Sequence, residues 1–122
     1  MLNNKIIVTG GSGRFGKNLK KMTGSNYYFP NKKQLNILNV KSIYKYLRKN
    51  KPKYLIHLAG LSRPMSLHNT NLSKSINLNI IGTANTVIAC SMLNIKLIYF
   101  STSYVYPGKK GKYKETDPLL PW

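Results

Sequence analysis

Short apolar runs alternate with amphipathic segments along this chain. The first run, Ile6 to Val8, is β-branched and is soon followed by glycines, a pattern typical of a short strand buried on both faces. Comparable runs predict three further strands, at 27–29, 53–60 and 96–103. Pro30 follows the second run and Gly60 ends the third, as is usual where a strand gives way to a turn.

Between these runs, apolar residues recur at helical spacing and predict helices over 13–22, 40–50 and 71–94. The expected buried stripes are Phe15, Leu19 and Met22; then Val40, Ile43, Tyr44 and Leu47; and then Ile76, Ile80, Thr83, Val87 and Leu93. Strands that alternate with helices indicate an α/β fold with a doubly wound parallel sheet of about four strands. We expect one domain over 1–122, with loop from Pro107 onward.

The charge of the chain is strongly one-sided. Twenty Lys and Arg residues against two acids give a formal net charge of +18. Only three of the twenty are arginine, the residue best suited to bidentate phosphate contacts, so the composition is a poor match to dedicated nucleic-acid readout. A genome rich in Lys, Asn and Ile codons would account for the bias. Attraction to a polyanion is the alternative.

Other composition signals restrict the classes of protein. A single cysteine, Cys90, lies in an apolar run, so we expect a buried core thiol, no disulfide framework and a cytoplasmic location. No secretion signal or membrane-spanning run is visible. His57 lies within an apolar strand and is expected to be a hydrogen-bonded core residue, and His68 is alone in a loop. No cluster of metal-ligating residues is present, so no metal site is predicted.

The segment Thr9–Gly16 has the spacing TGxxGxxG, directly after a strand and at the start of a helix. Gly10 permits a tight turn, Gly13 lets backbone N–H groups approach a pyrophosphate, and Gly16 lets the helix pack close to the sheet. Asn18 stands where the ATP-type loop requires Ser or Thr. The sequence therefore predicts a Rossmann-like fold that binds a dinucleotide. A glycine-rich turn without a ligand is the alternative.

The end of the second strand bears on which dinucleotide binds. An acidic residue there would accept a hydrogen bond from a ribose 2′-hydroxyl and favour NAD(H). The sequence instead has Asn31, Lys32 and Lys33 after Pro30, and cationic residues suit a 2′-phosphate. We expect NADP(H) rather than NAD(H), with Lys32 as a cofactor contact. The alternative is that these lysines form a solvated turn.

The third and fourth strands also end in residues suited to a site. His57–Gly60 finishes with small residues that would let a flat cofactor lie against the backbone, and 101–106 carries a cluster of hydroxyls. A hydroxyl beside a nicotinamide can polarise a carbonyl that accepts hydride. Ser or Thr at the end of a strand is also common as a turn or helix cap.

Taken together, the motifs resemble those of the extended short-chain dehydrogenase/reductase family, and within it the dTDP-4-dehydrorhamnose reductase branch of nucleotide-sugar enzymes. The resemblance rests on the order and spacing of six segments: VTGGSGRFG, LNILN, HLAG, NIIGTAN, STSYVYPG and YKETDPLLP. The epimerases and dehydratases of the same superfamily share these N-terminal motifs.

The resemblance implies roles for specific residues. Contacts to the cofactor diphosphate would come from Gly10, Gly13, Arg14, Phe15 and Gly16. Asn36, in place of the usual Asp, and Ile37 would lie near the adenine, while Leu58, Ala59 and Gly60 would line the cofactor. Asn79 would support the active-site helix, and Thr102 would be the catalytic hydroxyl that shares a hydrogen bond with the substrate carbonyl.

The family's Tyr-x-x-x-Lys motif is not found. Tyr106 is followed by Lys110, but Pro107 and Gly108 between them prevent a helix from aligning the pair. We therefore expect a fold truncated before the catalytic helix and the C-terminal substrate domain, inactive by itself, in which the last predicted strand is an apolar edge open to a complementing chain or an oligomer.

The expected function is that of the N-terminal, cofactor-binding part of an NAD(P)H-dependent nucleotide-sugar reductase in dTDP-rhamnose biosynthesis. A nucleotide sugar would bind only with the missing C-terminal part. The alternatives are an epimerase or dehydratase fragment, a stand-alone dinucleotide-binding module without catalysis, and a basic polyanion-binding protein. Neither a membrane nor a nucleic acid is expected as a partner.

Overall fold

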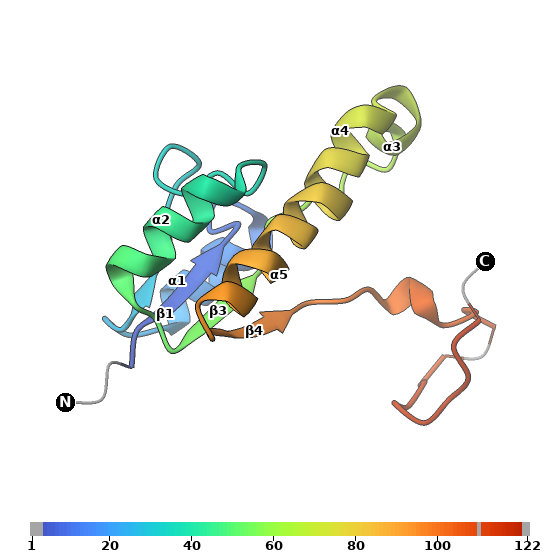
Figure 1. Ribbon diagram of the computed structural model, residues 1–122. Coiled ribbons are helices and arrows are strands. Elements are labelled where there is room, and N and C mark those ends of the chain that lie inside the picture. The colour runs from blue at the N-terminus through green and yellow to red at the C-terminus, as the bar shows by residue number, and fades with distance from the viewer. Residues whose placement is uncertain (1–3, 110, 121–122) are drawn as a thin grey trace.

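The computed structural model describes residues 4–109 and 111–120, and Figure 1 shows their arrangement. The strands are β1 Ile6–Thr9, β2 Tyr27–Tyr28, β3 Tyr54–His57 and β4 Lys96–Tyr99. The α-helices are α1 Arg14–Met22, α2 Val40–Asn50, α3 Ser66–Thr70, α4 Leu72–Ile76 and α5 Gly82–Met92. A π-helical turn, Asn77–Ile81, joins α4 to α5, and a 3₁₀ turn, Ser103–Val105, follows β4.

The four strands form one parallel sheet in the order β2-β1-β3-β4. The chain moves from β1 outward to β2, then crosses back over β1 to reach β3. The direction of winding therefore reverses between β1 and β3, and such a switch point opens a crevice at the carboxyl ends of the two strands. The predicted four-stranded, doubly wound α/β fold is confirmed.

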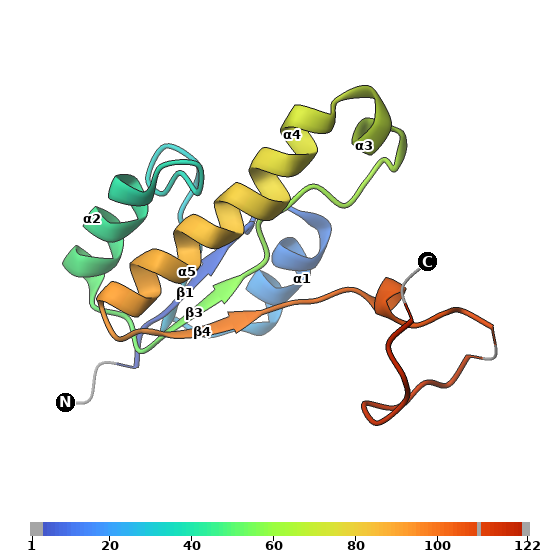
Figure 2. The same ribbon diagram turned by 45° about the vertical axis from the view of Figure 1, so that its right-hand side comes forward.

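Helices cover both faces of the sheet. Figure 2 shows α1 on the opposite side of the strands from α2, while α2 and α5 lie side by side. The core lies mainly under these two helices and is built from buried apolar residues: Ile7, Leu35, Ile37, Ile43, Leu47, Leu55, Ala89 and Cys90. Since Cys90 is buried in this cluster, the prediction of a core thiol is confirmed.

The sequence of α2 explains both of its ends. The side chain of Asn39 accepts a hydrogen bond from the backbone N–H of Ser42, which caps the first turn. Lys51 adopts a left-handed conformation, and its N–H donates to the carbonyl oxygen of Leu47. Pro52 follows and prevents the helix from continuing. The helix therefore has the bounds that its periodicity predicts.

The predicted helix over 71–94 is interrupted, and its expected buried stripe is wrong. The π-helical turn shifts the register between α4 and α5. Ile80 is 60% exposed and Val87 46% exposed, although both were expected to be buried. The residues that α5 buries are instead small ones: Gly82, Thr86, Ala89 and Cys90. Small side chains let α5 approach the sheet closely. The face that carries them is therefore the buried one, although the opposite face carries larger apolar residues.

Other departures concern α1, α3 and β4. The expected stripe on α1 is also wrong, because Phe15 and Met22 are exposed. His68, expected in a loop, lies in α3, and its Nδ1 is 2.7 Å from the Ser75 hydroxyl oxygen. In the described part of the chain β4 pairs with β3 alone, which leaves it as the edge strand, and beyond it the chain runs away from the sheet (Figure 1).

No helix among the described residues is both long enough and apolar enough to cross a membrane.

Candidate functional site

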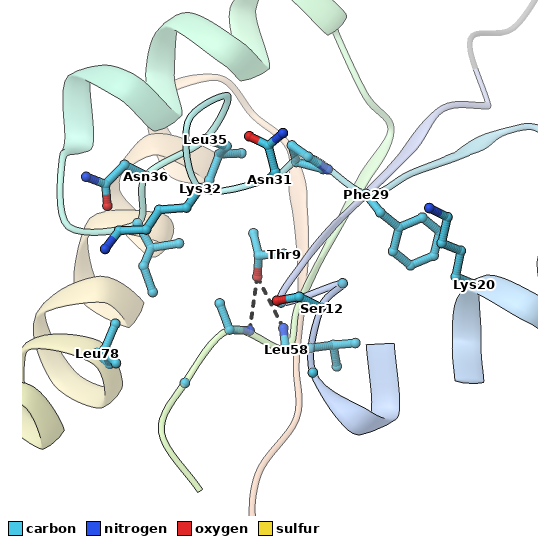
Figure 3. A pocket seen from close by; sticks show the side chains of 17 residues that line it. Thr9, Ser12, Lys20, Phe29, Asn31, Lys32, Leu35, Asn36, Leu58 and Leu78 are labelled. Atoms are coloured by element: carbon cyan, nitrogen blue, oxygen red, sulfur yellow. Dashed lines mark hydrogen bonds between the residues drawn. The ribbon is translucent and has the colours of Figure 1, made fainter. Parts of the chain in front are cut away.

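A cavity of about 570 Å³ lies at the carboxyl ends of β1 and β3, at the switch point of the sheet (Figure 3). Eight of the residues proposed from the sequence line it: Gly10, Gly13, Lys32, Asn36, Ile37, Leu58, Ala59 and Gly60. Nine further residues complete the lining: Thr9, Gly11, Ser12, Lys20, Phe29, Pro30, Asn31, Leu35 and Leu78. The cavity therefore combines the glycine loop with α1, the segment after β2, the segment after β3 and the π-helical turn.

The glycine loop forms the floor of the cavity. Two of its glycines lie in close contact with other parts of the backbone. Gly10 has a φ of 73°, and a Cβ there would lie 2.6 Å from the amide nitrogen of Ala59. A Cβ on Gly16 would lie 2.7 Å from the Cα of Gly11 and would also overlap the Gly10 carbonyl oxygen. Only glycine fits at both positions, so the turn holds α1 against the ends of β1 and β3.

The start of α1 faces this loop with unsatisfied donors. Gly13 occupies the N-cap position, and its N–H bonds the Gly10 carbonyl oxygen at 3.0 Å. No side chain in the described residues caps this helix, so the N–H groups of its first turn have neither an intrahelical nor a side-chain partner. These N–H groups and the helix dipole together make a favourable position for an anion.

Thr9 connects the two strands that flank the crevice. Its hydroxyl oxygen accepts hydrogen bonds from the N–H groups of Leu58 and Ala59, both at 3.2 Å, and lies 2.8 Å from His57 Nδ1. A hydroxyl has one hydrogen and two acceptor lone pairs, so Thr9 must donate to Nδ1. This bond network fixes the backbone after β3 against the end of β1, and Figure 3 shows two of its bonds.

The same count fixes the tautomer of His57. With Nδ1 as an acceptor, the ring carries its hydrogen on Nε2, which lies 3.3 Å from the Thr83 hydroxyl on α5. Burial lowers the pKa of His57 below its ordinary value of 6.5, which favours the neutral ring. The prediction of a hydrogen-bonded core histidine is confirmed. His57 supports the site from beneath and does not line the cavity.

One wall of the cavity is formed by Leu35, Asn36 and Ile37. The Asn36 side-chain oxygen accepts from the N–H of Leu38, which leaves its amide group to supply donors at the cavity surface. Ile37 is buried, and its side chain occupies the space that a Cβ on Gly82 would need. Asn85 donates to the Ile37 carbonyl oxygen at 3.0 Å, so α5 holds this wall in place.

Asn79 lies in the π-helical turn and holds the loop after β3. Its side-chain oxygen accepts from the N–H of Leu61 at 2.7 Å, and its amide nitrogen donates to the Leu61 carbonyl oxygen at 2.9 Å. A Cβ on Gly60 would lie 2.9 Å from the same side-chain oxygen. The residue thus contacts the loop that forms the cavity wall rather than the cavity itself.

The remaining candidates lie outside the lining. Arg14 and Phe15 are exposed on the first turn of α1, and the Phe15 ring lies 5.2 Å from that of Phe100. Thr102 is exposed three residues beyond β4, and its hydroxyl oxygen accepts from the N–H of Tyr104 at 3.2 Å. This is the helix-capping geometry that Ser and Thr often adopt, and it leaves the hydroxyl hydrogen free to donate.

Several lining residues were missed because only the fold brings them together. Lys20 stands seven residues after Gly13, so helical spacing places it on the same side of α1, but periodicity alone does not show what that side faces. Phe29 lies just beyond the short β2. Leu78 reaches the cavity through the π-helical turn, which no sequence pattern marks.

The reversed winding, the glycine turn and the cavity at the switch point define a Rossmann-like unit of the class that binds dinucleotides. Residues 4–122 match the family described as RmlD substrate binding domain, and the chain belongs to this family.

Relatives of the chain include enzymes named for reactions of sugar nucleotides and also the methionine adenosyltransferase 2 subunit beta of several mammals. The chain is 35% identical over 120 residues to GDP-L-colitose synthase of Yersinia pseudotuberculosis, covering 95% of this chain and 39% of that protein. It is 27% identical over 122 residues to dTDP-4-dehydrorhamnose reductase of Aggregatibacter actinomycetemcomitans, covering 96% and 41%. The chain therefore spans about two-fifths of these relatives, and the predicted resemblance to the N-terminal part of such enzymes is confirmed.

A solved structure shows the same fold. The crystal structure of dTDP-4-dehydrorhamnose reductase from Bacillus anthracis, in complex with NADP, superimposes with a TM-score of 0.85 at 27% identity. The match covers 97% of this chain and 43% of that one.

Proposed function

We propose that this chain is the cofactor-binding part of an NADP(H)-dependent nucleotide-sugar reductase. The observation that carries the proposal is the cavity at the switch point, which the Gly10 turn and the uncapped start of α1 close on one side. The cavity joins a site for an anion to a wall that offers the Asn36 amide. That combination suits the adenosine diphosphate half of a dinucleotide, with the diphosphate at the glycine loop and the adenine at the Asn36 wall.

The residues present fit a dinucleotide. The backbone of Gly10 to Gly16 would bind the diphosphate, with Arg14 and Phe15 beside it. Asn36 and Ile37 would contact the adenine, and Leu58 to Gly60 would support the rest of the molecule. Lysines in the lining and the absence of acidic residues from the sequence of 4–109 favour NADP(H), and NADP is the ligand of the Bacillus anthracis relative.

Bound NADPH would supply hydride for reduction of a sugar carbonyl. Thr102 is the residue of this chain that we assign to the substrate carbonyl, because its hydroxyl hydrogen is not used by the cap. A donor aimed at the carbonyl oxygen stabilises the negative charge that develops there during reduction. The family resemblance assigns proton donation to a Tyr-x-x-x-Lys motif. The proposed reaction therefore requires a protein that also contains this motif.

Binding is tested by titrating the full chain with NADPH in a calorimeter. We expect Gly13→Val to weaken binding by about tenfold or more, because its side chain would block access to the N–H groups of α1. Gly24→Ala is the matched control, since a Cβ there would meet its nearest atom at an ordinary 3.6 Å. Absence of NADPH binding by the parent, or equal affinity of the parent and a folded Gly13→Val chain, would overturn the proposal.

The reaction is tested in a chimera of residues 1–122 with the C-terminal part of the Bacillus anthracis reductase. Oxidation of NADPH is measured with dTDP-4-dehydrorhamnose. We expect Thr102→Val to lower kcat by about 10²-fold, the scale for loss of one donor to a developing oxyanion, and Ser101→Ala to change it little. A chimera that binds NADPH but reduces no sugar would contradict the assignment as a reductase.

A further inference from the structure

We propose that Lys20, on α1, is the residue that selects the 2′-phosphate of NADP(H), and that Lys32 lies at the wall assigned to the adenine and does not select the phosphate. This inference rests on the proposed function, since it assumes that a dinucleotide occupies the cavity. It assigns the specificity of the site to a residue that the glycine motif and the end of β2 do not indicate.

The position of a 2′-phosphate follows from the fold. In a doubly wound sheet the adenine ribose lies at the end of the second strand, where an acidic or basic side chain meets its 2′ group. Here β2 ends at Tyr28, and the next two residues, Phe29 and Pro30, line the cavity. A cation that selects the phosphate must therefore lie beside Phe29 and Pro30.

Lys20 meets this condition. It lines the cavity, and its ammonium nitrogen lies 6.0 Å from the centre of the Phe29 ring. The ring itself is held close to the glycine loop, since two of its side-chain carbons lie 3.0 Å from where a Cβ on Gly11 would be. Phe29 thus connects the loop that would bind the diphosphate to the lysine, and cation–π attraction favours this placement of the ammonium group.

Lys32 extends in a different direction. In Figure 3 its side chain reaches toward Asn36, whereas Lys20 lies beside Phe29 on the other side of the view. The turn that carries Lys32 is fixed by the Asn31 side chain, which accepts from the N–H groups of Lys33 and Gln34 at 3.0 and 3.1 Å. Lys32 therefore faces the wall assigned to the adenine, and we expect it to affect NADPH and NADH alike.

The charge around Lys20 strengthens the selection. Residues 4–109 contain no Asp or Glu, so no carboxylate in that range competes for its ammonium group. For the same reason the range offers no carboxylate to accept a hydrogen bond from the 2′-hydroxyl of NADH. A phosphate with nearly two negative charges gains a charge-assisted hydrogen bond from Lys20 that the hydroxyl cannot match.

The experiment measures the Kd of NADPH and of NADH by calorimetry at constant ionic strength, for the full chain and for single Lys→Met variants. We expect Lys20→Met to weaken NADPH binding by about tenfold or more and to leave NADH binding within about twofold, as loss of one charge-assisted hydrogen bond requires. Lys32→Met should weaken both. Lys21→Met is the matched control: it removes the same charge from the next position of α1, where the side chain is exposed and lies outside the cavity lining.

Two results would overturn the inference while the proposed function stands. One is a ratio of the two Kd values that changes no more in Lys20→Met than in Lys21→Met. The other is a ratio that depends on Lys32 instead. If the parent chain binds neither dinucleotide, the proposed function fails and the inference fails with it. Binding of 2′,5′-ADP against 5′-ADP to the same variants repeats the comparison without the nicotinamide.

Discussion

The hydrogen bonds of Thr9 and His57 show how single residues build this site. Thr9 accepts from two amides after β3 and donates to His57 Nδ1, which in turn requires a hydrogen on Nε2. Protonation of Nδ1 would leave two donors facing each other between the ring and the hydroxyl. The carboxyl ends of β1 and β3, which define the cavity, are therefore joined in this geometry only while His57 is neutral.

This arrangement predicts a dependence of stability on pH. Burial lowers the pKa of folded His57 below 6.5, so the unfolded chain binds the proton more readily. The free energy of unfolding is therefore greatest above pH 6.5. It falls as the pH drops toward the folded-state pKa, by at most about 1.4 kcal/mol per pH unit for one proton.

Urea unfolding of the full chain between pH 7.5 and pH 5 measures this dependence. His57→Gln, which removes the buried imidazole, should lose this slope. An NMR titration of the His57 ring in the parent chain provides a second measurement. A pKa of His57 at or above 6.5 would contradict the prediction.

At the scale of elements, the π-helical turn between α4 and α5 places Asn79 against the loop after β3. Single-turn π segments are often found at functional sites, and here the extra residue aims one side chain at both backbone groups of Leu61. Figure 2 shows α4 and α5 as one continuous rod that extends beyond the sheet toward α3. Through Asn79 the rod holds the loop after β3, and through Asn85 it holds the wall formed by Leu35, Asn36 and Ile37.

We expect Asn79→Ala to destabilise the chain by about 1–3 kcal/mol, because it leaves the N–H and carbonyl of Leu61 without their partners. Hydrogen exchange of the Leu61 amide should become faster by a larger factor than exchange in the core of β3. Asn77→Ala, an exposed residue of the same turn, is the matched control. Equal exchange at Leu61 in the two variants would show that Asn79 does not hold the loop.

The elements also show what the sequence could and could not predict. β1, the turn after it and α2 follow from local signals: a β-branched run, glycines that avoid close contacts, and an Asn cap. The buried faces of α1 and α5 were predicted incorrectly, because large apolar residues were assumed to point inward. In α5 the packing against Ile37 requires Gly82, so distant contacts decided the face. The same limit hid Lys20 and Leu78 from the predicted site.

At the scale of the whole molecule, an exposed apolar surface is combined with a large positive charge. Two apolar side chains are exposed at the edge strand: Ile98 in β4 is 43% exposed, and Phe100, directly after β4, is 49% exposed. The Phe15 ring packs on Phe100. An edge strand with apolar neighbours favours pairing with another chain. A net charge of +18 opposes that pairing between copies of this chain, because the repulsion acts over the Debye length.

These opposing effects predict that self-association of the chain increases with salt. The Debye length falls from about 10 Å at 0.1 M to about 3 Å at 1 M, which screens the repulsion but leaves the apolar attraction in place. Light scattering after size-exclusion chromatography should therefore show larger species at 1 M NaCl. The double variant Ile98→Thr and Phe100→Thr should remain smaller at that salt concentration, because its surface beside β4 is more polar.

Met22→Thr is the control, since it removes another exposed apolar side chain, at the end of α1. If the Met22 variant suppresses association as strongly as the double variant does, the surface beside β4 is not its site, and a decrease in size with salt would show that repulsion does not limit association.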